Sequence, residues 1–278
     1  MYTSQITRSN PSAILFLIDQ SGSMTDHMPA GTSKAQYVAD VLNRSLYELT
    51  VRCTRSDGVR DYFHVGVLGY NSIGIVNGFS GELNANLMHP ISEIESNPLR
   101  VEERIKKEPD GAGSYYEFKL KFPIWFEPRA EGGTPMQAAL VRAAEEISQW
   151  CDDPNHMDSF PPTILHITDG ESTDGDPEEL AKQLQKLSTS DGQVLLFNLH
   201  LSSQNTDPIL YPADEAALPN QYSKMLFRMS SPLPKQLITY AKDKGLAISN
   251  ESRGFVFNAD AISIVDFFDI GSKAIQVG

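Results

Sequence analysis

The chain has 278 residues, of which 40% are hydrophobic and 9% aromatic, so it can bury a substantial core as one large α/β domain or two small ones. Its formal net charge of -13 argues against a protein that binds nucleic acid through phosphate contacts, because such contacts need clustered Lys and Arg. The first residues lack the apolar stretch of a signal peptide and no apolar run reaches membrane-spanning length, so we expect a soluble, cytoplasmic protein that does not bind a membrane.

The first predicted element is a buried strand that ends in oxygen-bearing side chains. Residues 13–19 form an apolar run that closes with Asp19, and open α/β sheets place their sites at such strand ends. Ser21 and Ser23 follow across Gly22, whose tight turn can bring both hydroxyls toward the carboxylate. Three hard oxygen ligands that leave coordination positions open suit Mg²⁺.

A helix and two strands follow. Apolar side chains recur at helical spacing over residues 34–53, with Ser33 as the expected N-cap. Residues 63–70 predict a second buried strand, and residues 73–79 predict an edge strand that returns antiparallel to it. The alternation of strands and helices predicts an α/β fold with a doubly wound, Rossmann-like sheet that is mostly parallel, with one antiparallel edge strand.

Residues 81–131 are too long for an ordinary connection, which has about four to six residues. Polar and apolar side chains alternate over residues 117–126, and residues 101–108 can pair with them across a glycine-containing turn. We interpret residues 81–131 as an insertion within a single domain of residues 1–278, forming a β-hairpin near the candidate metal loop. Two roles stay open for it: a structural flap over the sheet edge, or a wall of a partner-binding surface.

Two later loops offer further oxygen ligands. Thr134 follows a pair of glycines, where a helix over residues 134–150 is expected to begin, so a role as that helix's N-cap is the alternative to metal binding. Asp169 comes directly after a predicted buried strand, residues 163–168. Asp174 or Asp176, a few residues on, is expected to cap the helix that starts near residue 177, with a second cation site as the less favoured alternative.

The remaining chain predicts continued alternation of helices and strands. The expected elements are a helix over 177–189, a strand over 193–201, a long loop over 202–231, a helix over 233–244, a short strand over 254–257 and a last helix over 262–275.

The histidines and cysteines show no metal-ligand spacing. His166 and His200 lie in predicted strands, where a hydrogen-bonded structural role is expected, and His156 lies in a predicted loop, where we expect it to face solvent. Cys53 and Cys151 are expected to be reduced packing residues near helix ends.

Together, the three loops resemble the metal-ion-dependent adhesion site (MIDAS) of von Willebrand factor A (VWA) domains. Asp19, Ser21 and Ser23 match the family's Asp-x-Ser-x-Ser motif, while Thr134 and Asp169 match the threonine and aspartate that it takes from two further loops. The resemblance implies a VWA fold, with the three hydroxyls as metal ligands and the two carboxylates coordinating directly or through water. It implies Mg²⁺ as the ion, with Mn²⁺ or Ca²⁺ as possible substitutes.

In that family a partner's Glu or Asp side chain completes the coordination, so the resemblance implies metal-dependent protein recognition. Most of the chain also resembles stand-alone bacterial VWA proteins similar to TerY and YegL, which are often associated with stress or phosphorylation signalling. This second likeness implies a kinase, a phosphatase, a client protein or a chaperone-like ATPase as the partner.

A metal-dependent phosphohydrolase that uses Asp19 as its nucleophile is the alternative function. Such enzymes carry a second aspartate two positions later as general acid, and here that position is Ser21. The chain also lacks a Walker-type phosphate loop and a Gly-x-Ser-x-Gly motif around either serine. We therefore do not expect an enzyme.

Overall fold

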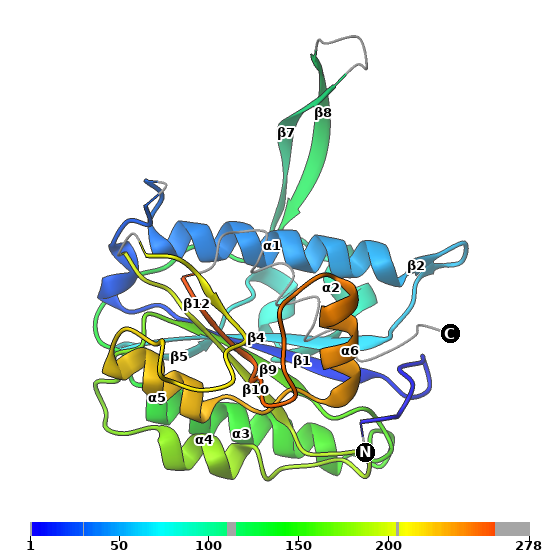
Figure 1. The fold of residues 1–278 in the computed structure, drawn as a ribbon. Helices are drawn as coiled ribbons and strands as arrows, with labels where there is room; N and C mark the ends of the chain where they lie inside the picture. The colour runs from blue at the N-terminus through cyan, green and yellow to red at the C-terminus, as the bar shows by residue number, and fades with distance from the viewer. Residues whose placement is uncertain (1, 30, 110–114, 204–205, 259–278) are drawn as a thin grey trace.

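The computed structural model describes residues 2–29, 31–109, 115–203 and 206–258, and a twisted sheet with helices on both faces lies at its centre (Figure 1). The strands are β1 (Ser12–Asp19), β2 (Thr54–Arg55), β3 (Gly58–Val59), β4 (Phe63–Asn71), β5 (Gly74–Asn77), β6 (Met88–Pro90), β7 (Arg100–Pro109), β8 (Tyr115–Ile124), β9 (Thr163–Thr168), β10 (Leu195–His200), β11 (Ile209–Leu210) and β12 (Phe255–Phe257). The helices are η1 (Gly22–Thr25), α1 (Lys34–Cys53), η2 (Gly81–Asn84), α2 (Ile91–Ser96), α3 (Met136–Asp152), α4 (Glu178–Leu184), α5 (Gln221–Met229) and α6 (Lys235–Asp243).

The main sheet has the strand order β11-β12-β10-β9-β1-β4-β5, and β6 also pairs with β4. The pairs between β4, β1, β9, β10 and β12 are parallel, which confirms the predicted doubly wound α/β sheet. Antiparallel strands lie at both edges, where the sequence predicts only β5: β6 pairs with β4, and β11 with β12. These two strands have three and two residues, too few for an alternating pattern to show.

Two hydrophobic clusters fill the space on either side of the sheet. One includes residues of α1 and α6, and the other includes residues of α3, α4 and α5. Successive side chains of β1 alternate between them, so that Phe16 belongs to the first cluster and Leu17 to the second. Burial on both faces explains why β1 is an unbroken apolar run.

The prediction of a long loop over residues 202–231 is wrong, because this segment contains β11 and the helix α5. Asn220 caps α5: its side chain accepts a hydrogen bond from the Ser223 backbone N–H, and the Ser223 hydroxyl lies 3.3 Å from the Asn220 nitrogen. This capping box was the available sequence signal. The predicted last helix, residues 262–275, lies outside the described residues.

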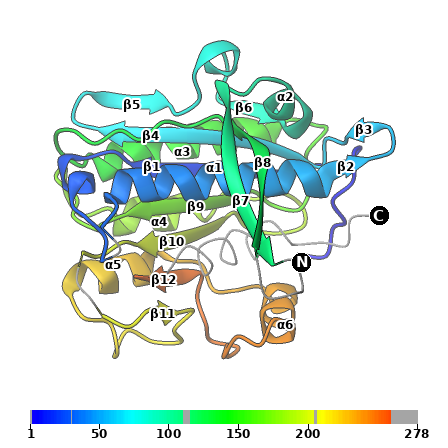
Figure 2. The same cartoon turned by 90° about the horizontal axis from the view of Figure 1, so that it is seen from above.

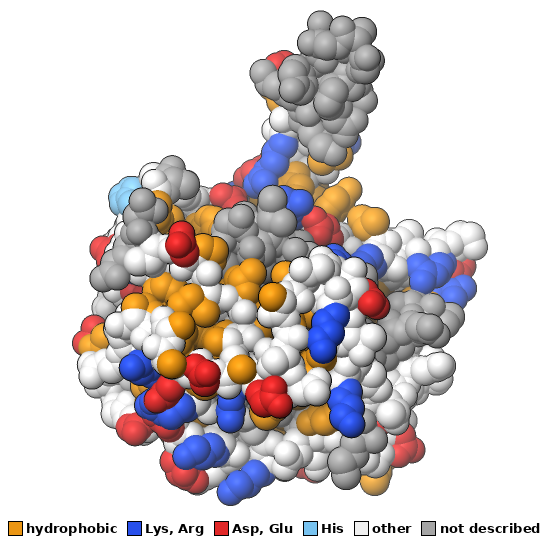
Figure 3. Space-filling view, in the orientation of Figure 1, with side chains coloured by type: hydrophobic (Ala, Val, Ile, Leu, Met, Phe, Trp, Pro, Cys, Tyr) orange, Lys and Arg blue, Asp and Glu red, His pale blue; other side chains and the backbone are white. Residues whose placement is uncertain are grey.

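Strands β7 and β8 form the predicted hairpin, with register from Arg100 opposite Ile124 to Pro109 opposite Tyr115. The hairpin stands beside α1 and points away from the body of the molecule (Figures 1 and 2). Figure 3 shows hydrophobic, basic and acidic side chains mixed along its stem. Contacts with α1 fix where the base of the hairpin lies but not where its tip lies. The expectation that the hairpin lies near the candidate metal loop therefore stays a prediction.

The rest of residues 81–131 belongs to the body of the protein. Strand β6 extends the sheet, and Trp125 and Phe126, directly after the hairpin, are buried in the core. Asn43 of α1 holds this chain: its side-chain oxygen accepts hydrogen bonds from both backbone N–H groups, at 2.8 and 3.0 Å, and its amide donates to the Phe126 carbonyl at 2.8 Å. The hairpin is therefore the part of this segment that projects.

The buried histidines and cysteines mostly have the expected packing roles. His166 bonds Tyr70 and Asn198, His200 bonds a backbone carbonyl, and both cysteines are buried and free. The prediction that His156 faces solvent is wrong, because its ring is buried and stacks on a tryptophan with 4.1 Å between ring centroids. None of the helices in the described part of the chain has the length and apolar character that a membrane span requires.

Candidate metal site

The candidate site lies where the strands β1 and β9 end side by side. They are parallel neighbours, with Ile18 opposite Ile167, so the two loops that follow them leave the same edge of the sheet. Asp19 is the last residue of β1, and Asp169 directly follows β9. The chain before α3 meets the β1 loop through a backbone hydrogen bond of 2.8 Å from Gly22 to Gly132.

The β1 loop turns back on its own carboxylate. Asp19 Oδ1 accepts a hydrogen bond of 2.8 Å from the Ser21 backbone N–H, and the hydroxyls of Ser21 and Ser23 lie 3.1 Å apart. Adjacent ligands of an octahedral ion with bonds of about 2.1 Å are about 3.0 Å apart, so this spacing matches two such ligands. Asp19 and Ser21 are each 1% exposed, whereas Ser23 is exposed to solvent.

The loop that carries Thr134 is joined to the β9 loop. The Thr134 backbone N–H donates to Thr173 Oγ1 at 2.9 Å, and the Thr173 N–H donates to the Thr134 carbonyl at 2.9 Å. Gly132 has φ +71°, and a Cβ there would lie 1.8 Å from Ser72 Oγ, so both conformation and space favour glycine. The hydrogen bonds to Gly22 and Thr173 thus tie this loop to both of the others.

Thr134 is not the N-cap of α3, which begins two residues later than predicted, at Met136. Asp174 of the β9 loop satisfies the N-terminus instead: its carboxylate accepts hydrogen bonds of 3.0 Å from the backbone N–H groups of Gln137 and Ala138. Of the two residues expected to cap the following helix, Asp174 therefore caps α3 instead. Asp176 fills that place, with a bond of 3.0 Å from the first N–H of α4.

Asp169 is paired with a residue that the sequence did not single out. The Lys34 ammonium lies 3.1 Å from Asp169 Oδ2, and the two side chains are 5% and 9% exposed. Asp169 Oδ1 is buried and has no hydrogen-bond partner in the described part of the chain. The Asp169 carbonyl accepts a bond of 2.8 Å from His200 Nε2, and burial lowers the pKa of this histidine to about 4, so its ring is neutral at pH 7.

Asp19 is held in a low-dielectric position. Burial raises its pKa, hydrogen bonds from Ser21 and Thr168 lower it and the charge of Asp169 adds a smaller increase, so that the resulting pKa is about 6. The Thr168 hydroxyl lies 2.6 Å from Asp19 Oδ2. Sequence reasoning missed Thr168, although a hydroxyl at the end of an apolar strand was a signal, and it missed Lys34, which is 135 residues from its partner.

The donor set fits an oxygen-seeking divalent cation. Among the described residues, no group of three or more His, Cys, Asp and Glu could hold a metal ion, so hydroxyl oxygens would have to join the two carboxylates. The unpartnered Asp169 Oδ1 and the 3.1 Å hydroxyl pair are the two features that fit such an ion. Hard oxygen donors favour Mg²⁺, Mn²⁺ or Ca²⁺ over the metals that prefer nitrogen or sulfur.

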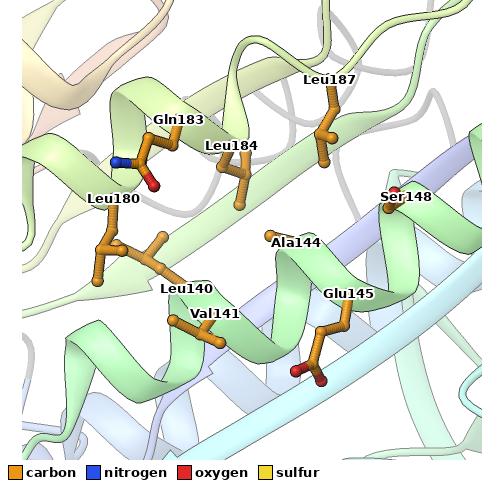
Figure 4. Close-up of a pocket in the computed structure, with 9 residues that line it drawn as sticks. All are labelled: Leu140, Val141, Ala144, Glu145, Ser148, Leu180, Gln183, Leu184 and Leu187. Carbon is orange, nitrogen blue, oxygen red and sulfur yellow. The ribbon is translucent and has the colours of Figure 1, made fainter.

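A separate pocket of about 430 Å³ lies between α3 and α4 (Figure 4). Leucine, valine and alanine side chains form most of its wall, with Glu145, Ser148 and Gln183 as its polar members. None of the five predicted metal ligands lines it. Its apolar wall lacks the convergent oxygen ligands of the β1 and β9 loops.

Comparisons with known proteins bear on the fold. The sequence matches no protein-family model, and a search of curated proteins finds no similar sequence. Among solved structures, the chain is similar to the pilus adhesin SpaC from Lactobacillus rhamnosus GG, with 14% identity and a TM-score of 0.51, over 95% of this chain and 30% of SpaC. This chain thus spans only 30% of the length of that adhesin.

Two further structures are similar over much of the chain. An aerotolerance-related membrane protein from Bacteroides fragilis NCTC 9343 has 12% identity and a TM-score of 0.45, over 95% of this chain and 98% of that one. The SpRpn10 VWA domain has 10% identity and a TM-score of 0.39, over 70% and 77%. The SpaC match shows a shared fold. The mostly parallel sheet, its antiparallel edges and the separate hairpin give the chain the kind of α/β fold that the resemblance to VWA domains implies.

Proposed function

We propose that this chain is a metal-dependent protein-recognition module. Asp19, Ser21, Ser23, Thr134 and Asp169 would hold Mg²⁺, with Mn²⁺ or Ca²⁺ as substitutes, and a partner would present a Glu or Asp side chain. The observation that carries the proposal is Asp169 Oδ1, a buried carboxylate oxygen without a hydrogen-bond partner in the described residues. When bound, the cation supplies an open coordination position that accepts an outside carboxylate oxygen.

The surrounding residues support this role because they fix the donors in advance. Asp19 accepts hydrogen bonds on both carboxylate oxygens, from Ser21 and Thr168, which holds the carboxylate at the start of the β1 loop. Ser23 lies at the solvent-exposed side of the hydroxyl pair, where a partner can approach. Groups held by such supporting contacts need little reordering when a ligand binds.

The same contacts argue against the phosphohydrolase alternative. A nucleophilic carboxylate needs an oxygen that can approach the substrate, whereas Asp19 is 1% exposed and uses both oxygens in hydrogen bonds. We therefore propose recognition rather than catalysis.

The class of partner depends on the resemblance to stand-alone bacterial VWA proteins. We propose a cytoplasmic partner from a stress or phosphorylation-signalling system, such as a kinase, a phosphatase or an ATPase. Neither nucleic acid nor a membrane is part of the proposal.

Replacement Asp19→Asn tests the site while keeping the shape of the side chain. We expect Mn²⁺ affinity, measured by electron paramagnetic resonance of the free ion, to fall by at least about 10-fold, because a buried anionic donor is lost. The same variant should lose the partners that the wild-type chain captures from its native lysate in Mg²⁺ and releases in chelator. Asp243→Asn, an exposed carboxylate at the end of α6, is the matched control. Equal Mn²⁺ affinity in Asp19→Asn would overturn the proposal.

A further inference from the structure

Lys34 places a fixed positive charge inside the candidate metal site. It is the first residue of α1, and its side chain is 5% exposed. Its ammonium nitrogen lies 3.1 Å from Asp169 Oδ2 and 3.5 Å from the Ser23 carbonyl oxygen. A third contact, of 3.4 Å, reaches Asp26, whose side chain is 56% exposed. Lys34 thus bridges the β1 and β9 loops.

The ion pair with Lys34 leaves one oxygen of the Asp169 carboxylate available. Lys34 contacts Oδ2 of Asp169, while Oδ1 of the same group is buried without a hydrogen-bond partner in the described residues. The carboxylate can therefore keep its ion pair and still offer an oxygen to a second cation. Both positive charges would then share one poorly solvated site.

The balance of charge follows from this sharing. In the absence of metal, Lys34 offsets one of the two negative charges that Asp19 and Asp169 carry when ionised. Among the buried groups, a divalent cation would be neutralised by the two carboxylates alone, which leaves the Lys34 charge as a formal surplus of one. The Asp26 carboxylate, which also contacts Lys34, is 56% exposed, so solvent screens its charge. Charges this close and this buried repel one another more strongly than exposed charges do, because little solvent screens them.

We propose that Lys34 is a built-in counterion that weakens the binding of a divalent cation and strengthens the binding of an anionic ligand to the loaded site. The inference rests on the proposed function. It adds the residue that sets how strongly the site binds the divalent cation relative to the anionic ligand. A carboxylate from a partner neutralises the surplus charge, whereas a water molecule does not. The site therefore favours an anionic ligand once it is loaded.

The first test compares Mn²⁺ affinity among the full-length wild type, Lys34→Met, Lys34→Arg and a control. Lys34→Met keeps the length of the side chain and removes its charge, so Mn²⁺ should bind ~10-fold more tightly or better. Lys34→Arg keeps the charge and should stay within about threefold of the wild type. Lys235→Met is the matched control, since Lys235 is the exposed first residue of α6, which lies away from the start of α1 (Figures 1 and 2).

The second test measures the anionic ligand, with acetate as the probe. Acetate that displaces water from bound Mn²⁺ lowers the longitudinal relaxation rate of the water protons. At saturating Mn²⁺, Lys34→Met should need about fivefold more acetate than the wild type to reach half of this decrease, because the surplus charge is gone. An unchanged acetate requirement would overturn this half of the proposal.

The two proposals fail in different ways. If Asp19→Asn leaves the Mn²⁺ affinity of the wild type unchanged, the metal does not bind here, and both proposals fall. If Asp19→Asn weakens Mn²⁺ but Lys34→Met binds it no more tightly than the wild type, only the Lys34 proposal falls. A thermal unfolding curve of each variant shows that it is folded before its affinity is measured.

Discussion

The candidate metal site at the ends of β1 and β9, called the metal edge below, and the β7–β8 hairpin are held in place by different kinds of contact. At the metal edge, three loops from distant parts of the chain are held by short buried contacts, such as the 2.6 Å bond from Thr168 to Asp19. The hairpin is held mainly by pairing between its own two strands, and it meets α1 at its base, where Phe122 lies beside Tyr47 with 5.7 Å between ring centroids. Contacts between distant parts of the chain hold the first region, and contacts between neighbouring strands hold the second.

This difference shows where the free energy of unfolding of each region comes from. The base of the hairpin is anchored through buried groups of the core, above all Asn43, whose side chain is 2% exposed. On the hairpin strand β7, Val101 and Ile105 are 54% and 65% exposed, so they bury little apolar surface. At the metal edge the buried groups are charged and hydroxylic, so there burial opposes stability unless a cation is bound.

The largest expected effect is at the hairpin anchor. Asn43→Ala leaves the backbone N–H groups of Trp125 and Phe126 and one carbonyl without their partner inside the core. Each such group costs about 1–3 kcal/mol, so we expect the free energy of unfolding in urea to fall by roughly 3–5 kcal/mol. Asn155→Ala, an exposed asparagine that bonds within its own turn, should change it little. A loss below about 1 kcal/mol from Asn43→Ala would show that Asn43 does not anchor the base of the hairpin.

The next effect is the pH dependence of the metal-free site. The pKa of Asp19 is raised from 3.8 to about 6 on folding, so its stabilising contribution is complete below pH 3.8 and is lost as the pH rises through 6. At pH 7 the metal-free protein should be less stable than at low pH by about 3 kcal/mol from this group alone. About 2 kcal/mol of this loss falls between pH 4.5 and 7, where urea unfolding in chelator can measure it, and Asp19→Asn should lack this part of the pH dependence.

Metal binding should raise the free energy of unfolding at pH 7, where ionisation of Asp19 lowers it. A cation that binds the ionised Asp19 stabilises the folded wild type at pH 7, and Asp19→Asn should show less of this gain. If wild type and Asp19→Asn have parallel stability curves from pH 4.5 to 7, the carboxylate is not the group that makes the metal edge costly.

The smallest expected effect is removal of the hairpin tip. Arg104 and Leu120 are paired across the hairpin, so replacing residues 105–119 with Asn-Gly joins them by a two-residue turn in the same register. The free energy of unfolding should change by less than about 1 kcal/mol, because this part projects from the body (Figure 1). A loss above about 2 kcal/mol would show that the tip supports the core.

The same variant separates the two roles that the sequence left open for the hairpin. If the chain keeps its stability but captures less partner from the lysate in Mg²⁺, the hairpin is a wall of the binding surface. If capture is unchanged, its role is structural.

Several features of this protein follow from the sequence alone because they depend on neighbouring residues. The alternating pattern of residues 117–126 predicts the strand β8, and the apolar spacing after Ser33 predicts α1 with its cap. The Asp-x-Ser-x-Ser motif likewise predicts the turn that brings two hydroxyls to 3.1 Å, since this geometry is set within five residues. These elements therefore depend on residues close in sequence and not on the position of distant parts of the chain.

Only the tertiary structure decided what the distant parts do for one another. Asp174 was one of two residues expected to cap the helix that follows it, yet it caps α3, which lies earlier in the chain. Lys34 pairs with Asp169 across 135 residues, and no local pattern marks either partner for the other. Buried charges and backbone groups find whichever partner the packed sheet brings within reach, and the order of strands β9, β1 and β4 sets that partner, not the order of residues in the chain.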